Sequence, residues 1–516
     1  MLTNMYSLHG SIAASVLLLV ATAAFPAERI RDVERVSDGP ATGMVEYMTH
    51  CAVCHGDTML GAAQGSPLVG LGLRHGESMT EIAASITKGY EEKGMPAWSN
   101  MFSAQEIKSL ALLIAEKRAG FSSDLNINAE LVIPAQVFES GGQAFVLEVV
   151  TDELDRLPYS MTLLPNDSIV VSEKMRGLRI VSADGEVSSL ISGTPKIRDD
   201  VFLLAADNLE FGTGWLLDVQ AHPNYAQNGW LYLHYTECQQ RCEAVGDEDN
   251  PPQSRNVLVR GRIKDGRWLD QELIWQAASF DASQYLDMVA GGRIAFDPDG
   301  YVFITVGMRS MDAIQDLRSP YGKIHRIHDD GRIPTDNPFV NQADAIKTIW
   351  TLGHRSPQGL FFDVPTRLLY ETEHGPRGGD EINVLRPGKN YGWPLFSSGQ
   401  NYDGTEVAHG RTVSELELQD TEQPVVDWVP SPAISNLTVY RGDAFPNWRG
   451  QILVGSLKAS NLYRLEAQNE SQEIMVPNLA RIRDIDVDRA GLVYLLLEHA
   501  SGGQIVRLKP YVANAQ

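Results

Sequence analysis

A short unit of sequence recurs six times from about residue 140 onward in this 516-residue chain. Each copy is a turn rich in Pro, Asn, Asp or Gly, followed by a run of β-branched and aromatic residues, which is how a strand begins after a tight turn. The turns begin at Pro165, Pro223, Pro298, Pro365, Pro446 and Asp488. Roughly 60 residues per copy accommodate a four-stranded blade with its loops. The repeat predicts an all-β six-bladed propeller, because a large β-sandwich would not explain it.

The N-terminal part carries a different signal, the string C-A-V-C-H at residues 51–55. The thiols of Cys51 and Cys54 can reach the two vinyl groups of one haem, and His55 then lies under the iron as proximal ligand. A redox C-x-x-C pair or half of a zinc site would leave the same letters, but no second Cys pair lies near enough to complete a zinc tetrahedron. The motif resembles that of class I c-type cytochromes.

The residues after this motif support a haem site. Met95 stands in a Gly-Met-Pro loop, where a thioether is the expected sixth ligand, with core packing as its alternative role. The string S-A-Q-E at 103–106 is a capping box. It opens a helix with apolar residues at 107, 110, 113 and 114, which share one face. These features together resemble a small all-α cytochrome c domain.

The chain therefore divides into a signal peptide over 1–27, a cytochrome c domain over 28–120, a linker over 121–138 and a propeller over 139–512. The apolar stretch Ser11–Ala24 is short for a membrane span and suits a signal peptide. No Lys or Arg precedes it, so an uncleaved membrane tether remains an alternative. Either way, the rest of the chain is expected in the periplasm.

Charge and the remaining cysteines fit this compartment. The formal net charge is −23, and a surface this acidic repels phosphate backbones, which excludes nucleic acid as a partner. Cys238 and Cys242 follow a predicted strand in a polar loop. In an oxidising compartment we expect them to form a local disulfide.

Three strings in the propeller region carry a second resemblance. They are GHRSPQGL at 353–360, EHGPRGGDEIN at 373–383 and NYGWP at 390–394. This run resembles the soluble quinoprotein glucose/sorbosone dehydrogenase family over about 145–510. That family consists of six-bladed propellers that bind pyrroloquinoline quinone (PQQ) and calcium, so the resemblance implies both cofactors here.

The resemblance also implies residues that would hold PQQ, whose three carboxylates require fixed cations. Arg355 would lie near the quinone oxygens. Lys458 would meet one carboxylate, and Arg481 and Arg483, which alternate along a strand to the same side, would hold the others. Ser431 falls where the family has a small hydroxyl residue that touches the cofactor.

Calcium would be bound beside the quinone. The resemblance implies that Gly375 and Pro376 give backbone carbonyls to this ion, which as a hard cation takes oxygen ligands and polarises the quinone carbonyl. A plain turn is the alternative for these two residues. A second, structural calcium would use the backbone near Glu381 and Tyr391.

The sequence departs from the family at the position of the catalytic base. The family's catalytic His lies four residues before the Arg of a Gly-Gly-Arg motif, and here that Arg is Arg293 and the position is Val289. Where the family has an acidic residue after a Thr-Val-Gly string, this chain has Met308. A base contributes about 10²–10⁴-fold to rate. His374, beside the calcium turn, and Asp287 are the candidate substitutes.

Two functions follow from these patterns. In the first, a sugar or another alcohol or aldehyde is oxidised at PQQ, and electrons pass to the covalently bound haem and on to a periplasmic or membrane acceptor. Fusion favours this reading because the propeller then holds its own acceptor at high local concentration. In the second, an electron-carrying cytochrome is fused to a ligand-binding propeller without dehydrogenase activity.

Overall fold

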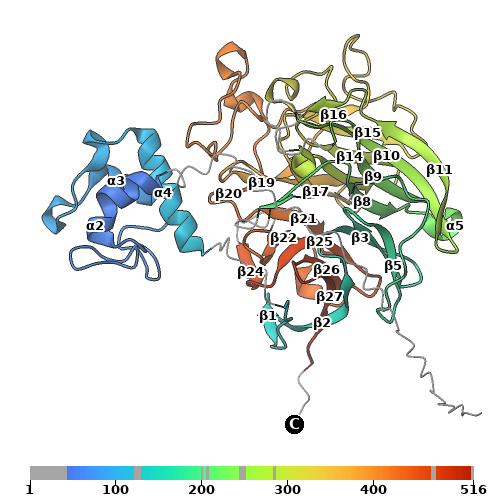
Figure 1. Cartoon of the computed structure of the whole chain (residues 1–516), viewed down its shortest axis with the longest axis horizontal. Helices are drawn as coiled ribbons and strands as arrows, with labels where there is room; N and C mark the ends of the chain where they lie inside the picture. Colours follow the sequence, from blue (N-terminus) through green and yellow to red (C-terminus); the bar gives the residue numbers. More distant parts are fainter. Residues whose placement is uncertain are drawn as a thin grey trace, which may run out of the picture.

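The computed structural model describes residues 43–120, 130–198, 202–204, 209–242, 251–282, 286–466 and 472–512. The expected signal peptide at 1–27 lies outside these residues. A small helical domain stands beside a much larger ring of strands (Figure 1). Of the described helices, none is long and apolar enough to cross a membrane.

The helical domain is built from short elements and one long helix. They are α1 (Met44–Glu46), the π-helical η1 (Tyr47–Cys51), α2 (Ala52–His55), α3 (Met79–Lys88), the 3-10 turns η2 (Glu91–Lys93) and η3 (Trp98–Asn100), and α4 (Ala104–Ala119). Ser103 and Glu106 form the expected capping box at the start of α4, and Ser78 and Glu81 form another before α3. These caps satisfy N–H groups that a helix leaves without internal partners.

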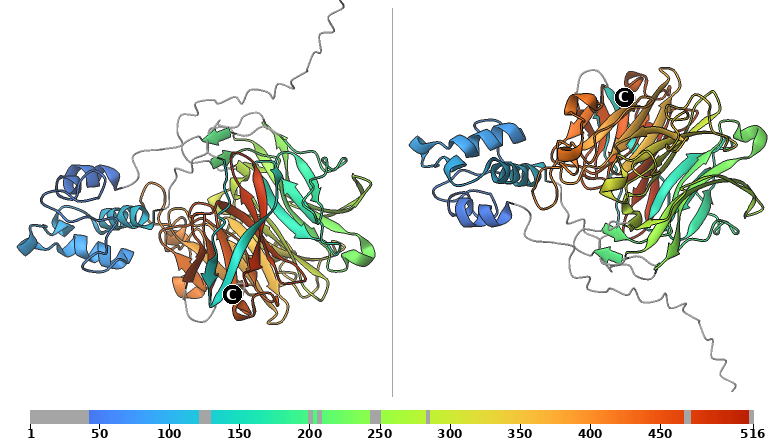
Figure 2. Two further views of the ribbon diagram at one scale, coloured as in Figure 1. Left: turned by 90° about the horizontal axis from the view of Figure 1, so that it is seen from below. Right: turned by 90° about the horizontal axis from the view of Figure 1, so that it is seen from above.

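Within the part of the chain that the structure describes, the larger domain has seven sheets: six blades arranged around one axis and a separate two-stranded ribbon. Figure 2 shows this domain from two further sides. The first three blades are β3 (Pro158–Leu163), β4 (Ile169–Glu173) and β5 (Gly177–Val181); β8 (Leu216–Ala221), β9 (Leu231–Gln240), β10 (Gln253–Lys264) and β11 (Arg267–Gln276); and β13 (Gly291–Phe296), β14 (Tyr301–Val306), β15 (Lys323–His328) and β16 (Ile349–Leu352). The next two are β17 (Pro357–Asp363), β18 (Leu368–Glu373), β19 (Asp380–Leu385) and β20 (Val426–Trp428); and β21 (Ile434–Val439), β22 (Ile452–Ser456), β23 (Leu462–Leu465) and β24 (Gln472–Val476).

The sixth blade closes the ring. It joins β25 (Arg481–Val487), β26 (Val493–Glu498) and β27 (Gly503–Pro510) from the end of the chain to β2 (Gln143–Leu154) and β1 (Phe138–Ser140) from the start of the domain. Smaller elements are the β6–β7 ribbon (Phe202–Leu204 and Leu209–Phe211), α5 (Tyr225–Asn228) and β12 (Asp281–Ala282). Because this blade pairs strands from both ends of the domain, the ring is closed at this point.

The predicted repeat has a structural meaning. Each of the six turns joins the first strand of a blade to its second, from β3–β4 round to β25–β26. The first strands contact one another in ring order, β3, β8, β13, β17, β21, β25 and back to β3. The six-bladed propeller is confirmed, and so is the Cys238–Cys242 disulfide, which lies at the end of β9.

Arg293 ties the blades together at the axis. From β13 its Nε donates to Gln358 O of β17 at 2.7 Å, and its Nη1 lies 3.1 Å from the Asp484 carboxylate of β25. The side chain is fully buried, and a buried charge is tolerated when it is paired and hydrogen-bonded. The Gly-Gly-Arg string therefore serves the scaffold, and it positions the blade ends that surround the pocket.

Candidate active site

The haem motif lies where α2 meets the core of the helical domain. His55 Nδ1 is 2.7 Å from Ser66 O, so Nδ1–H donates to that carbonyl and the Nε2 lone pair faces away from it. This hydrogen bond fixes the tautomer that an axial histidine needs. Cys51 and Cys54 are free thiols. Burial, with a smaller contribution from Cys54, raises the pKa of Cys51 to about 11, whereas redox C-x-x-C pairs have a lowered thiol pKa.

Met95 belongs to the same core. Tyr90 N donates to Met95 O at 2.7 Å and Met95 N donates to Tyr90 O at 3.1 Å, so the two residues form a small antiparallel bridge around Gly94. Gly94 has φ of 83°, a backbone conformation that favours glycine. Met95 and Cys51 both pack against the buried cluster centred on Tyr47 and Leu110. Free thiols, an oriented imidazole and a nearby thioether fit a haem with His and Met ligands.

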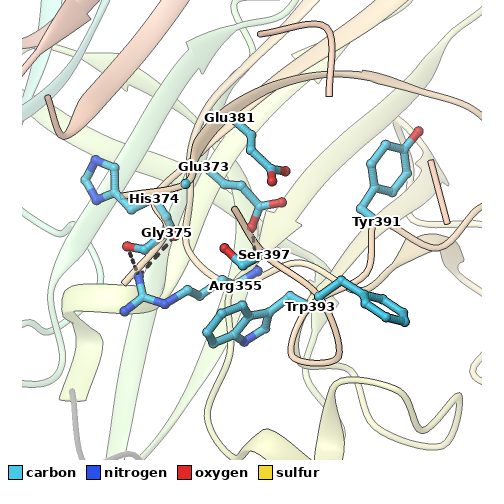
Figure 3. A pocket seen from close by; sticks show the side chains of 10 residues that line it. Arg355, Glu373, His374, Gly375, Glu381, Tyr391, Trp393 and Ser397 are labelled. Atoms are coloured by element: carbon cyan, nitrogen blue, oxygen red, sulfur yellow. Dashed lines mark hydrogen bonds between the residues drawn. The ribbon is translucent and has the colours of Figure 1, made fainter. Parts of the chain in front are cut away.

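A small pocket, with a cavity volume of about 10 Å³, opens on the propeller at the end of β18 (Figure 3). Its wall includes Arg355, Glu373, His374, Gly375, Glu381, Tyr391, Trp393 and Ser397. Arg355 Nη1 donates to the backbone oxygens of His374 at 3.0 Å and Gly375 at 2.9 Å. Its buried Nε has no hydrogen-bond partner among the described residues. Arg355, His374 and Gly375, all predicted from the sequence, therefore meet in one cavity.

His374 is held in one tautomer. Its Nε2–H donates to Ile434 O at 2.6 Å, which leaves the Nδ1 lone pair as the basic atom. Burial lowers the pKa of His374 below its usual value, so the ring is neutral at pH 7. A neutral imidazole at the pocket wall can accept a proton.

The segment 431–434 brings two further predicted residues beside His374. Lys458 N donates to Pro432 O at 3.1 Å, so the backbone of Lys458 lies beside the segment that contains Ser431. Ser431 Oγ donates to Asp380 Oδ1 at 2.7 Å, and the same carboxylate accepts from Gly375 N at 3.2 Å. The structure thus uses the Ser431 hydroxyl to brace the turn at 375–376.

Arg481 and Arg483 point to the same side of β25, as expected, but both bind Glu498 of β26. Arg481 Nε lies 2.9 Å from Oε2, and Arg483 Nη2 lies 2.8 Å from both carboxylate oxygens. Lys174 Nζ adds a contact of 3.5 Å. Three cations thus surround one buried acid. Arg483 also reaches Gln358 at 3.4 Å, which connects this group to the strand that follows Arg355.

A buried acidic cluster lies on the other side of the pocket. Glu371 and Glu373 of β18 face Asn383 and Glu381 of β19 in register. Burial, with repulsion from Glu373, raises the pKa of Glu371 and of Glu381 well above the usual value. Glu371 Oε1 and Asn383 Oδ1 are buried and have no hydrogen-bond partner among the described residues. Oxygen ligands without partners at a site of excess negative charge fit a divalent cation.

A ring nitrogen of His354 and one carboxylate oxygen each of Glu371 and Glu373 also lie within 4.8 Å of one another, close enough to share one ion. Gly375 and Pro376 follow in the buried turn. The Gly375 carbonyl already accepts from Arg355, and a carbonyl has a second lone pair to offer. The donor set therefore fits calcium both at the turn and in the acidic cluster.

The position of the family's base is apolar and closed. Val289 packs with Met308 and with Trp393, whose ring lines the pocket. Asp287 is unsuitable as a substitute base because it is buried and fully engaged. Its carboxylate accepts from Thr236 and Ser254 at 2.6 Å each and pairs with Arg309 at 2.9 Å. Of the two candidate substitute bases, His374 lines the pocket and Asp287 does not.

Sequence reasoning missed Glu498, Lys174 and the acidic cluster. The cluster had a signal, since Glu371 and Glu373 alternate in one strand and Glu381 and Asn383 alternate in the next, which places four oxygen-bearing side chains on one face of a hairpin. Glu498 is a lone acid that ends an otherwise apolar strand. Nothing local in the sequence pairs it with two arginines from another strand.

Comparison with known proteins identifies both domains. The family model described as glucose/sorbosone dehydrogenase matches residues 155–507. The chain belongs to the glucose/sorbosone dehydrogenase family. The model described as cytochrome c oxidase, cbb3-type, subunit III matches residues 38–114, so a cytochrome c domain precedes the family's propeller.

Individual relatives agree with this assignment. The aldose sugar dehydrogenase YliI of Escherichia coli (strain K12) is 34% identical over 373 residues, which cover 70% of this chain and 92% of the relative. Quinoprotein glucose dehydrogenase B of Acinetobacter calcoaceticus is 24% identical, with 77% and 93% covered. The crystal structure of the soluble E. coli aldose sugar dehydrogenase in its apo-form aligns with a TM-score of 0.61 at 31% identity, covering 71% of this chain and all of that one.

Proposed function

We propose that this protein is an exported quinoprotein dehydrogenase that oxidises an aldose or a related alcohol and passes the electrons to a haem bound in the same chain. One observation carries the proposal: the chain joins a family propeller, in which Arg355 stands in the pocket wall, to a cytochrome domain whose His55 is oriented for iron. A relative of the propeller is named a quinoprotein, which supports PQQ as the cofactor.

Cations that suit a tricarboxylate quinone lie in the pocket wall and on β25, where Arg483 contacts Gln358 of the strand that follows Arg355. Arg355 presents a buried Nε without a hydrogen-bond partner among the described residues, and Arg481 and Arg483 share the single acid Glu498. PQQ, when bound, supplies a two-electron acceptor. Forked arginines suit carboxylates in both charge and geometry. Lys458, Arg481 and Arg483 would hold the carboxylates, and Arg355 would face the quinone oxygens.

Calcium would bind at the turn formed by Gly375 and Pro376 and in the acidic cluster. Its chemistry at the first site is to polarise the carbonyl that accepts electrons. In the cluster it would offset repulsion between Glu371 and Glu381, which burial now forces toward their protonated forms. Asp380 and Ser431 brace the turn, so the same residues fix the backbone oxygens before an ion arrives.

His374 would take the proton from the substrate hydroxyl. Its Nε2–H is bound to Ile434 O, so Nδ1 is the accepting atom, and the lowered pKa keeps it unprotonated near neutral pH. Trp393, which packs on Val289, gives the pocket wall an apolar surface that would exclude water from the reacting atoms. Haem, attached through Cys51 and Cys54 with His55 and Met95 as ligands, supplies a one-electron acceptor.

The experiment follows the haem spectrum. The full chain, produced in a periplasm competent for haem attachment, is mixed with PQQ, calcium and a panel of sugars and alcohols. The expected result is reduction of the haem that requires both PQQ and substrate. Haem reduction that is the same with and without PQQ, or PQQ that fails to bind, would contradict the proposal.

A second candidate is a ligand-binding propeller without dehydrogenase activity. The apolar packing of Val289 and Met308 favours it, because neither position can move a proton. In that case PQQ or a substrate would bind without reducing the haem. The same experiment separates the two candidates, since only a dehydrogenase changes the haem spectrum when sugar is added.

A further inference from the structure

One face of α4 is turned away from the cytochrome core and toward the propeller. Gln105, Lys108, Ser109, Leu112 and Glu116 recur at intervals of three or four residues, so they share one side of the helix. Leu112 is fully buried, yet it is not part of the cluster that forms the cytochrome core. A buried leucine outside its own core indicates that this face is covered by the other domain.

Hydrogen bonds from this face reach one propeller loop. Lys108 Nζ donates to Ser398 O at 3.5 Å, and Ser109 Oγ donates to Gln400 Oε1 at 3.4 Å. At the start of the helix, Gln105 Nε2 donates to Gly404 O. The loop 396–404 thus lies against the first turns of the helix. Figure 1 shows α4 as the part of the helical domain nearest the ring.

Glu116 and Arg377 anchor the other end of the helix. Arg377 Nε lies 3.2 Å from Glu116 Oε1, and Nη2 lies 2.7 Å from Oε2, which is a forked pair. Both side chains are largely buried, at 9% and 18% exposed. The backbone N–H and C=O of Arg377 exchange hydrogen bonds of 3.0 Å with Gln400. The pair is therefore built into the same loop that contacts Ser109.

The opposite side of this loop and turn lines the pocket. Phe396 and Ser397 begin the loop and stand in the pocket wall, as do Gly375 and Gly379 on either side of Arg377. The two segments touch, since a Cβ at Gly399 would lie 2.2 Å from Gly378 O. One thin wall thus separates the pocket from α4.

The inner side of α4 faces the haem residues. Leu110, Leu113 and Ile114 belong to the cluster against which Cys51 and Met95 pack. A single helix and a single loop therefore stand between the pocket and the residues expected to hold haem. Long-range electrostatics does not hold the two domains together, because a chain of net charge −23 gives them no general attraction. Lys108 and Arg377 supply the local cations that this contact needs.

We propose that the outward face of α4 and the wall formed by 375–379 and 396–404 are the electron-transfer interface of this enzyme, with Arg377 as the positioning residue. This inference rests on the proposed function. Oxidation of one alcohol to a carbonyl releases two protons and two electrons. The haem accepts one electron at a time, so two electrons cross the wall in succession and an external one-electron acceptor re-oxidises the iron between them. The protons leave through His374 to solvent.

The test compares Glu116→Arg, Arg377→Glu and the double variant in the full chain loaded with haem, PQQ and calcium. Two rates are measured with an aldose: reduction of the haem, and reduction of phenazine methosulfate, a small dye that takes electrons without the cytochrome. Glu116→Arg is expected to slow haem reduction by about 10²-fold, the scale of an effective-concentration advantage, with dye reduction unchanged. The double variant restores the pair with reversed charges and regains haem reduction.

The control is Glu92→Arg, which makes the same charge change at an exposed site in η2. It should leave both rates as they are. The inference is overturned if Glu116→Arg leaves haem reduction intact, if the reversed pair fails to restore it, or if haem reduction in the wild type rises with protein concentration, which would mean transfer between molecules.

A failure of the proposed function would look different. If no substrate reduces the dye, the dehydrogenase proposal fails, and the contact itself is judged by small-angle X-ray scattering. Glu116→Arg should then increase the radius of gyration, and the reversed pair should return it to the wild-type value. An unchanged radius for Glu116→Arg would show that the anchor does not hold the domains together.

Discussion

Arg483 and Glu498 form a forked ion pair between neighbouring strands of the last blade, with Nη2 2.8 Å from both carboxylate oxygens. Burial alone would raise the pKa of Glu498, but attraction to Arg483, Lys174 and Arg481 outweighs it and holds the pKa below its usual range. The acid is therefore a fixed anion that orders three cations at the edge of the proposed cofactor site.

Replacing Glu498 by Gln should destabilise the propeller by about 3–5 kcal/mol at pH 7, because it leaves buried cations without their counter-charge. Since the pKa is depressed in the folded state, this contribution is fully present above the unfolded pKa of about 4.3 and is lost as pH falls toward the folded pKa. Urea unfolding followed by tryptophan fluorescence should show a wild-type advantage that shrinks only below about pH 4. The conservative control Glu148→Gln removes a surface acid paired with Arg507 and should cost about 1 kcal/mol or less.

The haem ligands give a prediction that does not depend on the propeller. Met95→Leu keeps the apolar volume but removes the sixth ligand, so the haem should stay covalently attached while its reduction potential falls. Spectroelectrochemistry measures the potential, and denaturing gels stained for haem measure attachment. Met101→Leu is the matched control, because Met101 is exposed. An unchanged reduction potential in Met95→Leu would show that Met95 is a core packing residue and not a haem ligand.

Calcium should stabilise the propeller through the acidic cluster. At a calcium concentration 100 times its dissociation constant, binding adds about 2.7 kcal/mol to the free energy of unfolding. Glu371→Gln removes one carboxylate whose Oε1 has no hydrogen-bond partner in the described part of the chain, so it should weaken calcium binding while leaving the apo-protein at least as stable as the wild type. Differential scanning calorimetry with calcium and with chelator checks both effects. Equal calcium stabilisation in variant and wild type would show that the cluster is not a cation site.

The fold was predictable because the repeat is local. Each copy places a turn directly before a strand, and hairpin turns are set by a few adjacent residues. The haem residues were predictable for the same reason, since Cys51, Cys54 and His55 adjoin one another. The closure of the ring by β2 and β27 leaves no such mark, because it pairs strands from opposite ends of the domain.

The site was only partly predictable. Sequence placed cations at Arg355, Arg481 and Arg483, but it could not show that Glu498 already pairs with two of them, because strand pairing decides that contact. The domain interface did leave a trace: residues 110–115 of α4 are apolar all round, and a helix of that kind is buried on more than one side. One apolar face alone was expected, so the second face was missed.

The last prediction concerns the proton acceptor. If His374 takes the substrate proton, His374→Gln should lower kcat for sugar oxidation by about 10²–10⁴-fold with PQQ binding retained, because the amide keeps a donor to Ile434 O but has no basic atom. Burial lowers the pKa of His374, so the wild-type rate should stay level down to pH values below 6.5 and fall only where the ring becomes protonated. Dye-linked pH–rate profiles of both proteins measure this.

Asp287→Asn provides the contrast that makes this result specific. Asp287 pairs with buried Arg309 and accepts from Thr236 and Ser254, so its loss should lower the midpoint of unfolding while the pH profile of the remaining activity stays as in the wild type. His374→Gln should do the reverse, with stability close to wild type and the acid limb of the profile removed. A profile that keeps its acid limb in His374→Gln would assign the proton transfer to another group.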